Sequence, residues 1–137
     1  HKVSLHSDAD AFLKHMQKLG KPAHLVTNAH HLTLEIKVKQ TGIDQYLETM
    51  LCSSEVGVPK HHQGFWDHAQ EDIGYDPART LFVDDSEKVL VAAREHGIRY
   101  LLHRSKPSMV DPPRPSDQFH SIEDFHPLMY PRQFPCL

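Results

Sequence analysis

Polar residues of complementary chemistry follow three short apolar runs of this 137-residue sequence. Thr27 and Asn28 end the run HLVTN, Lys60 follows EVGVP, and Asp84 and Asp85 end TLFVDD. A hydroxyl donates a hydrogen bond to a phosphate oxygen, a lysine neutralises phosphate charge, and carboxylates are ligands that Mg²⁺ prefers. If they converge, these residues could support phosphoryl transfer, which depends on positioning and on charge neutralisation.

Each of these signals has a simpler explanation when it is taken alone. Adjacent Asp and Ser residues are ordinary in solvated turns and at helix N-termini. A lysine that follows a proline is usually just solvated. The joint arrangement favours a site, because all three groups stand at the predicted ends of strands and ligands bind beyond those ends in α/β sheets.

The elements that would position these residues alternate between strands and helices. Periodicity and glycine stops predict helices that end at Gly20, Gly42, Gly74 and Gly97. The expected helices cover residues 7–19, 29–41, 61–73 and 86–96, and the expected strands cover residues 22–28, 49–53, 79–85 and 98–104. This alternation is typical of an α/β fold with a mostly parallel sheet covered on both faces. We expect residues 106–117 to be irregular and a short helix to follow at about residues 121–129.

Composition excludes several classes of function. The net charge is −3 and the pI is about 6.5, so the sequence indicates neither a nucleic-acid partner nor a membrane-surface partner. No apolar run approaches the roughly 20 residues of a membrane span, and no signal peptide opens the sequence. Two cysteines, Cys52 and Cys136, form no disulfide framework, which favours a cytoplasmic location. Because the sequence begins with His1 rather than methionine, we expect it to be a piece of a longer protein.

Three stretches resemble motifs two, three and four of the haloacid dehalogenase-like (HAD) hydrolases. They are HLVTNAH, GVPK and TLFVDDSEKVLVAAREHGIRY, and the likeness covers residues 7 to about 105. The resemblance implies a three-layer Rossmann-like core and a Mg²⁺-dependent hydrolysis of phosphate monoesters through an aspartyl-phosphate. Along the whole chain it points to purine nucleoside monophosphates as substrates, although the cap that would select the substrate precedes residue 1.

The resemblance also assigns roles at the ends of the first two strands. Thr27 matches the motif-two hydroxyl that holds a phosphoryl oxygen, with Asn28 beside it in the phosphate site. Lys60 matches the motif-three lysine that neutralises the phosphoryl group and the nucleophile. Thr27 and Lys60 are therefore the expected catalytic residues of this chain.

The metal site is expected at the end of the third strand. Asp85 matches the motif-four magnesium ligand, and Asp84 replaces the glycine of many relatives. Val89 stands four positions after Asp85, where many relatives carry an acidic residue. We expect Asp84 to compensate for this difference as a second metal ligand.

The first motif of the family, an apolar strand that runs into Asp-x-Asp-x-Thr, is missing from this sequence. Asp8 and Asp10 form an Asp-Ala-Asp, but no buried strand precedes it and no Gly-Thr follows it. We therefore expect residues 1–137 to be a partial core domain that has neither nucleophile nor cap and is inactive alone. Its nucleophile strand would come from a preceding segment of the same protein, and it would lie between the strands HLVTN and TLFVD.

Two other kinds of protein remain as alternatives. Signalling receiver domains also use an acidic pair, a threonine and a lysine around Mg²⁺, but their acidic pair precedes the other two in sequence. A non-catalytic binding domain is the second alternative. The histidine pairs His30–His31 and His61–His62 lack zinc-site spacing and are interpreted as surface residues, with His30 and His61 at the rim of the site. Phe65 and Trp66 are interpreted as core residues.

Overall fold

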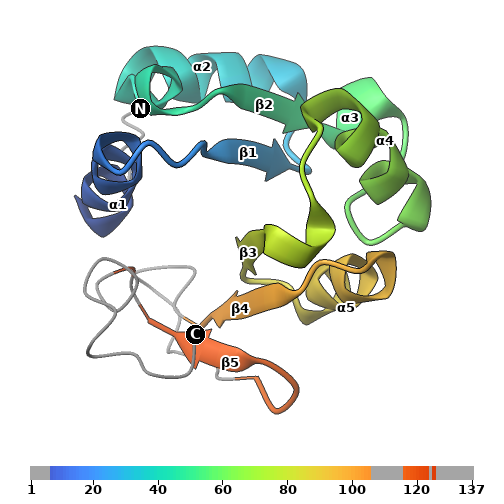
Figure 1. Cartoon of the computed structure of the whole chain (residues 1–137). Coiled ribbons are helices and arrows are strands. Elements are labelled where there is room, and N and C mark those ends of the chain that lie inside the picture. Colours follow the sequence, from blue (N-terminus) through green and yellow to red (C-terminus); the bar gives the residue numbers. More distant parts are fainter. Residues whose placement is uncertain (1–6, 106–115, 124, 126–137) are drawn as a thin grey trace.

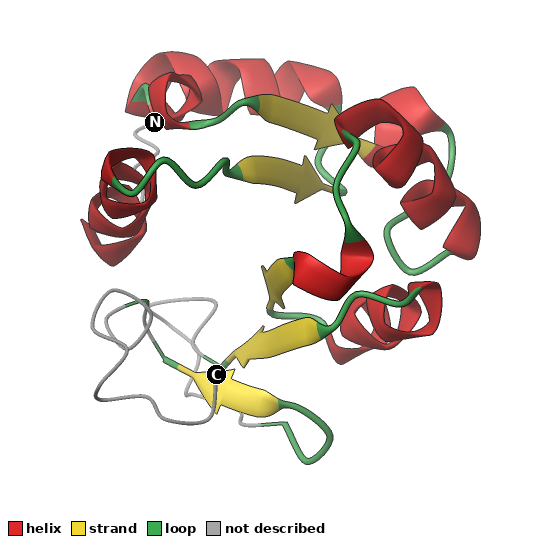
Figure 2. Cartoon of the chain, in the orientation of Figure 1, coloured by secondary structure: helices red, strands yellow, loops and turns green. Residues whose placement is uncertain are grey.

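The structure is a computed structural model that describes residues 7–105, 116–123 and 125 of the chain (Figure 1). Short strands alternate with helices, as the sequence predicts (Figure 2). The elements in chain order are α1 (Ser7–Lys18), β1 (His24–Thr27), α2 (His31–Thr41), η1 (Ile43–Tyr46), β2 (Thr49–Cys52), α3 (Ser53–Val56), α4 (Gln63–Ile73), η2 (Pro77–Arg79), β3 (Leu81–Asp84), α5 (Glu87–His96), β4 (Tyr100–Arg104) and β5 (His120–Ile122).

The described strands form two separate parallel sheets. One sheet pairs β1 with β2, and the other has the order β3-β4-β5. This result confirms the predicted α/β class and the parallel pairing. The strands β1 and β3 are not hydrogen-bonded neighbours in either sheet, as expected of two strands that a third would separate. In Figure 1 the two sheets lie edge to edge. Strand β1 is on the edge of its sheet that is nearer to β3, and β3 is on the edge of its sheet that is nearer to β1.

Three predicted glycine stops end helices in the structure. Gly42, Gly74 and Gly97 all adopt the left-handed conformation directly after α2, α4 and α5. Gly97 has a φ of 109°, and its backbone N–H donates to carbonyl groups in the last turn of α5. An L-amino acid with a side chain rarely adopts this conformation, so glycine determines where α5 ends and the chain turns back into β4.

One of the two hydrophobic clusters of the described residues connects the two sheets. Helices α4 and α5 pack against each other, and α5 also packs on β3 and β4. Phe65 is completely buried and Trp66 is 2% exposed, which confirms their predicted place in the core. Leu51 from β2 belongs to the same cluster, and Phe82 from β3 packs against it. Helices α4 and α5 therefore fix the position of the carboxyl end of β1 relative to that of β3.

The C-terminal part differs from the prediction where the structure describes it. We expected a helix at about residues 121–129, but residues 120–122 form the strand β5 beside β4. Ile122 is 4% exposed and packs with Leu102, so tertiary pairing and burial outweigh the local helical pattern. Of the irregular segment predicted for residues 106–117, residues 106–115 lie outside the described residues, and so does the rest of the expected helix apart from residues 123 and 125.

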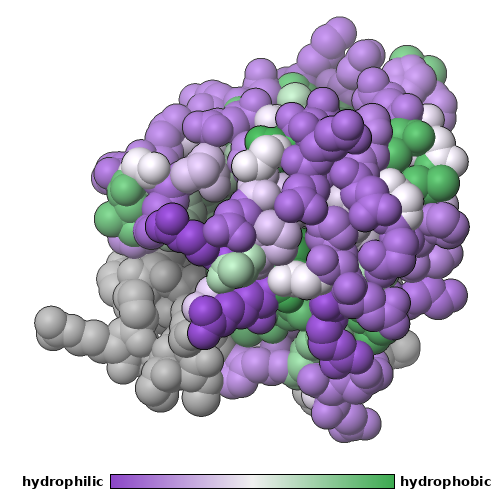
Figure 3. All heavy atoms as spheres, turned by 45° about the vertical axis from the view of Figure 1, so that its right-hand side comes forward, coloured by the Kyte–Doolittle hydropathy of each residue, from purple (hydrophilic) through white to green (hydrophobic). Residues whose placement is uncertain are grey.

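On the face drawn in Figure 3, hydrophobic side chains are scattered among hydrophilic ones. Among the described residues, the large apolar ones that are exposed are Leu19, Leu32, Ile36 and Leu81. In the part of the chain that the structure describes, every helix is too short or too polar to cross a membrane.

Candidate active site

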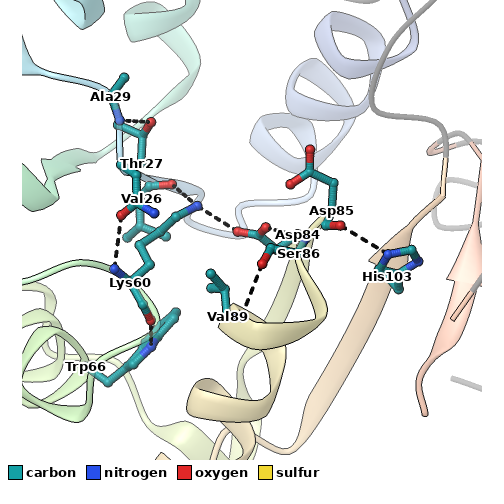
Figure 4. A network of polar contacts seen from close by, with 11 residues as sticks. Val26, Thr27, Ala29, Lys60, Trp66, Asp84, Asp85, Ser86, Val89 and His103 are labelled. Atoms are coloured by element: carbon teal, nitrogen blue, oxygen red, sulfur yellow. Dashed lines mark hydrogen bonds and ion pairs between the residues drawn. The ribbon is translucent and has the colours of Figure 1, made fainter. Parts of the chain in front are cut away.

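The predicted site residues come from three segments that meet at the carboxyl ends of β1 and β3 (Figure 4). Thr27 ends β1 and Asn28 follows it, Lys60 lies in the turn between α3 and α4, and Asp84 ends β3. Asp85 follows in the loop that leads into α5. The fold thus brings the polar ends of all three predicted segments to one region of the molecule.

Lys60 is held in place through its side chain and through both of its backbone polar groups. Its Nζ donates to Asp84 Oδ2 at 2.7 Å and lies 3.5 Å from the Val26 carbonyl oxygen. Its backbone N–H donates to Asn28 Oδ1 at 3.0 Å. Its carbonyl oxygen accepts a hydrogen bond from Trp66 Nε1 at 2.7 Å. The ammonium group therefore has a defined position between the two sheets.

Asp84 is the buried partner of this lysine. Its side chain is 6% exposed, and that of Lys60 is 12% exposed. Asp84 Oδ1 accepts from the backbone N–H of Ser86 at 2.9 Å, while Oδ2 accepts from Lys60. Both oxygens are thus engaged within the protein. The ion pair connects the lysine turn, and with it the end of β1, to the end of β3.

Asp85 differs from its neighbour because it is open to solvent on one side and only partly buried. Partial burial raises the pKa of the Asp85 carboxyl, and the adjacent Asp84 raises it further through a hydrogen bond and through its charge. Lys60 acts in the opposite direction. Because burial and the neighbouring Asp84 disfavour the ionised form of Asp85, a bound proton or cation is favoured at this carboxyl group.

The carboxylates of Asp84 and Asp85 fit a magnesium ion better than a softer metal. Mg²⁺ usually binds through one or two carboxylates and completes its shell with waters and phosphate oxygens. Within the described residues no cluster of three or more His, Cys, Asp or Glu residues could hold a metal. Asp85 is the better placed of the two as a ligand, because both oxygens of Asp84 already accept hydrogen bonds.

Thr27 and Asn28 use their side-chain oxygens in different ways. Thr27 Oγ1 accepts from the backbone N–H of Ala29 at 3.0 Å, and this leaves its hydroxyl hydrogen as a donor for a ligand. Asn28 is exposed, and its Oδ1 binds the backbone of Lys60. Its contact in the structure therefore positions the lysine turn, and the side-chain NH₂ remains the group that can donate to an anion.

Sequence reasoning missed the polar contributions of four residues. Trp66 was assigned to the core alone, although its indole N–H binds the Lys60 carbonyl. The ring of His103 on β4 contacts the Asp85 carbonyl oxygen at 3.1 Å. His30 and His62 precede α2 and α4, where each ring accepts a hydrogen bond from the first turn. Histidine is not a usual N-cap residue, so no sequence signal indicated these two contacts.

The variant Trp66→Phe tests whether the indole group positions Lys60. It keeps an aromatic ring but removes the donor to the Lys60 carbonyl, so we expect a loss of about 1–3 kcal/mol in unfolding free energy. We also expect a shift of the Lys60 Nζ resonance in NMR spectra of ¹⁵N-lysine-labelled protein. Phe65→Leu is the matched control, because Phe65 packs edge-on against Trp66. Equal Lys60 shifts in both variants would argue against positioning by the indole.

Comparison with known proteins places the chain among hydrolases. The sequence profile of the haloacid dehalogenase-like hydrolases matches residues 1–97. The GMP/IMP nucleotidase YrfG of Escherichia coli (strain K12) is 36% identical over 125 residues, which cover 91% of this chain and 56% of that protein. The pyrimidine 5'-nucleotidase YjjG of the same organism is 27% identical over 105 residues, which cover 72% of this chain and 47% of that protein.

The fold agrees with this assignment. A crystal structure of a dehalogenase with an intermediate complex matches 96% of this chain and 57% of that chain, with a TM-score of 0.78 and 19% sequence identity. The chain spans about half the length of the curated relatives it matches. The profile match extends over β1, the lysine turn and β3, which carry the candidate site. The chain belongs to the haloacid dehalogenase-like hydrolases.

Proposed function

We propose that this chain forms the phosphate-binding part of a Mg²⁺-dependent phosphomonoester hydrolase that acts on purine nucleoside monophosphates. The observation that carries the proposal is the contact of Lys60 Nζ with Asp84 Oδ2 at 2.7 Å. It fixes a cation beside the ends of β1 and β3, where the Thr27 hydroxyl and the Asp85 carboxylate are also found. Membership of the family supports hydrolysis, and the 36% identity to a GMP/IMP nucleotidase supports the substrate class.

In the proposed mechanism each residue of the chain acts on the phosphoryl group by position and charge. The Thr27 hydroxyl donates to one phosphoryl oxygen, and the Lys60 ammonium neutralises negative charge that spreads over the oxygens during transfer. Asp85 would hold the magnesium ion, and the carboxylate of Asp84 would add negative charge beside it. When it is bound, Mg²⁺ supplies further charge neutralisation at the phosphate oxygens. Asp84 keeps Lys60 in place through the buried ion pair.

The nucleophile of this reaction is proposed to come from a segment of the same protein that precedes residue 1. Asp8 and Asp10 lie in helix α1, and Asp10 pairs with Lys14 on that helix rather than with Lys60. An aspartate of the preceding segment would attack phosphorus and release the alcohol, which gives an aspartyl-phosphate. Water would then hydrolyse this acyl phosphate, which releases phosphate and regenerates the aspartate carboxylate. A strand that pairs with both β1 and β3 would deliver such a residue between Thr27 and Asp84.

The test is phosphate release by the complete protein, with its preceding segment, from nucleoside monophosphates and sugar phosphates. We expect hydrolysis of GMP and IMP that requires Mg²⁺. The variant Asp85→Asn should reduce turnover by at least about 100-fold, because a metal ligand contributes several kcal/mol of charge stabilisation. Asp72→Asn, an exposed residue of α4, is the matched control and should keep its activity. Activity that persists in Asp85→Asn or without Mg²⁺ would contradict the proposal.

Asp85→Asn should not weaken the fold itself. Because the pKa of Asp85 lies above its ordinary 3.8 in the folded chain, ionisation of this carboxyl lowers stability as pH rises through that window. The cost is complete at pH 7, and asparagine removes it. Without Mg²⁺ we therefore expect a Tm that is equal or slightly higher, with the gain kept small by solvent at this exposed side chain. A clearly lower Tm would mean that the loss of turnover reflects unfolding.

A further inference from the structure

His103 connects the loop of residues 84–86 to the C-terminal strand β5. It lies on β4 directly opposite Asp84 in the parallel register, and its side chain is buried. Its Nε2 is 3.1 Å from the Asp85 carbonyl oxygen (Figure 4), and its Nδ1 is 3.3 Å from Ser121 Oγ on β5. The buried imidazole thus contacts the backbone carbonyl of the candidate metal ligand, Asp85. It also contacts β5, a strand that begins 16 residues after β4 ends.

The geometry gives these hydrogen bonds a consistent direction. A carbonyl oxygen only accepts, so His103 Nε2 carries a hydrogen and donates to Asp85. In the neutral imidazole Nδ1 is then an acceptor, and the Ser121 hydroxyl donates to it. Ser121 Oγ in turn accepts from the backbone N–H of Ser116 at 2.8 Å. All polar atoms along this path are satisfied, as expected of a buried network that fixes one arrangement.

We propose that His103 is a positioning residue for the loop of residues 84–86, which carries the proposed metal ligand. We also propose that Ser121 sets the orientation of the His103 ring. The contact fixes the carbonyl of Asp85, and through that peptide group it fixes the direction in which the Asp85 side chain leaves the backbone. Partners that orient metal ligands contribute strongly to metal affinity. The inference rests on the proposed function, because it takes Asp85 as the magnesium ligand.

Variants at His103 separate its hydrogen bond from its packing. His103→Phe keeps a ring of similar shape but removes both nitrogen atoms. His103→Gln keeps an N–H donor at a similar reach toward the Asp85 carbonyl. Ser105→Ala is the matched control, because Ser105 is a buried residue directly after β4 whose hydroxyl donates to the Ile122 carbonyl of β5 at 3.3 Å. This control removes a hydrogen bond between the end of β4 and β5, and it leaves the loop of residues 84–86 unchanged.

Two readouts in the complete protein test the proposal. Calorimetric Mg²⁺ titration should show an affinity about 10-fold to 100-fold lower in His103→Phe. The loss should be smaller in His103→Gln, and Ser105→Ala should be unchanged. Amide hydrogen exchange without Mg²⁺ should be faster at Ser86, whose N–H donates to Asp84, in His103→Phe alone. Ser121→Ala provides an independent variant and should weaken Mg²⁺ binding to an intermediate extent.

The outcomes distinguish this inference from the proposed function. If Asp85→Asn does not weaken Mg²⁺ binding, the proposed function fails at its metal site. If Asp85→Asn weakens it but His103→Phe and Ser121→Ala do not, the role of His103 alone is overturned. Equal loss of Mg²⁺ affinity in His103→Phe and Ser105→Ala would show that His103 only supports the strand pair. If His103→Phe does not fold, the affinities of His103→Gln and Ser121→Ala decide the matter.

Discussion

Lys60→Met is expected to reduce phosphate ester hydrolysis by the complete protein by about 10²-fold to 10³-fold, the usual cost of removing one stabilising donor. The same change should destabilise the fold. Asp84 is 6% exposed, and without Lys60 its carboxylate would remain buried without a counterion. Breaking a buried ion pair by removing one partner costs about 3–5 kcal/mol. Phosphate release and urea unfolding measure the two effects separately.

Two further variants show whether the losses have separate causes. Lys14→Met removes a lysine whose ion pair with Asp10 is exposed, at 55% and 39%, and it should leave both stability and activity nearly unchanged. Lys60→Met combined with Asp84→Asn removes both buried charges, while the amide oxygen can still accept from Ser86. This double variant should regain much of the stability but none of the activity. If activity returned with stability, the role of Lys60 would be structural rather than catalytic.

Phosphate ester turnover by residues 1–137 alone is expected to be undetectable, whereas the protein with its preceding segment should be active. Thr27 and Lys60 can bind a phosphate group, but in the proposed mechanism Asp85 binds Mg²⁺ and the nucleophile comes from the preceding segment. Asp84 is engaged by Lys60 and Ser86, and Asp10 pairs with Lys14 on helix α1. Measuring phosphate release with Mg²⁺ from both forms of the protein tests this difference.

The same comparison should show a physical role of the preceding segment. Because β1 and β3 are not paired with each other, a strand inserted between them would satisfy backbone groups of both and bury more surface. The urea dependence of unfolding should therefore be steeper in the longer protein by more than its length alone predicts. Turnover by residues 1–137 that disappears in Asp8→Asn would contradict the proposal and place the nucleophile in α1.

The sequence predicted those features that depend on local chemistry. Strong strand patterns ending in Thr27 and Asp84 and glycine stops such as Gly97 specify where elements end. Since parallel strands place their carboxyl ends at one edge, the meeting of Lys60 with Asp84 could be expected from the order of the elements. The functional roles of these residues stay predictions until the variants are measured.

Features that arise between distant segments could not be predicted. Strand β5 has three residues, and its pairing with β4 gives no local periodic signal. The contact of His103 with Asp85 depends on the register of β3 and β4, and that of Trp66 with Lys60 depends on how the turn before α4 folds back. The different burial of Asp84 and Asp85 likewise follows from tertiary packing, because the two residues are identical in type.

A crystal structure of the complete protein with Mg²⁺ and inorganic phosphate tests the central claim most directly. The account predicts phosphate oxygens at hydrogen-bond distance, about 3 Å, from Thr27 Oγ1 and Lys60 Nζ. It also predicts a magnesium ion at about 2.1 Å from a carboxylate oxygen of Asp85 and from a phosphate oxygen. Phosphate bound away from Thr27 and Lys60, or Mg²⁺ bound without Asp85, would contradict it.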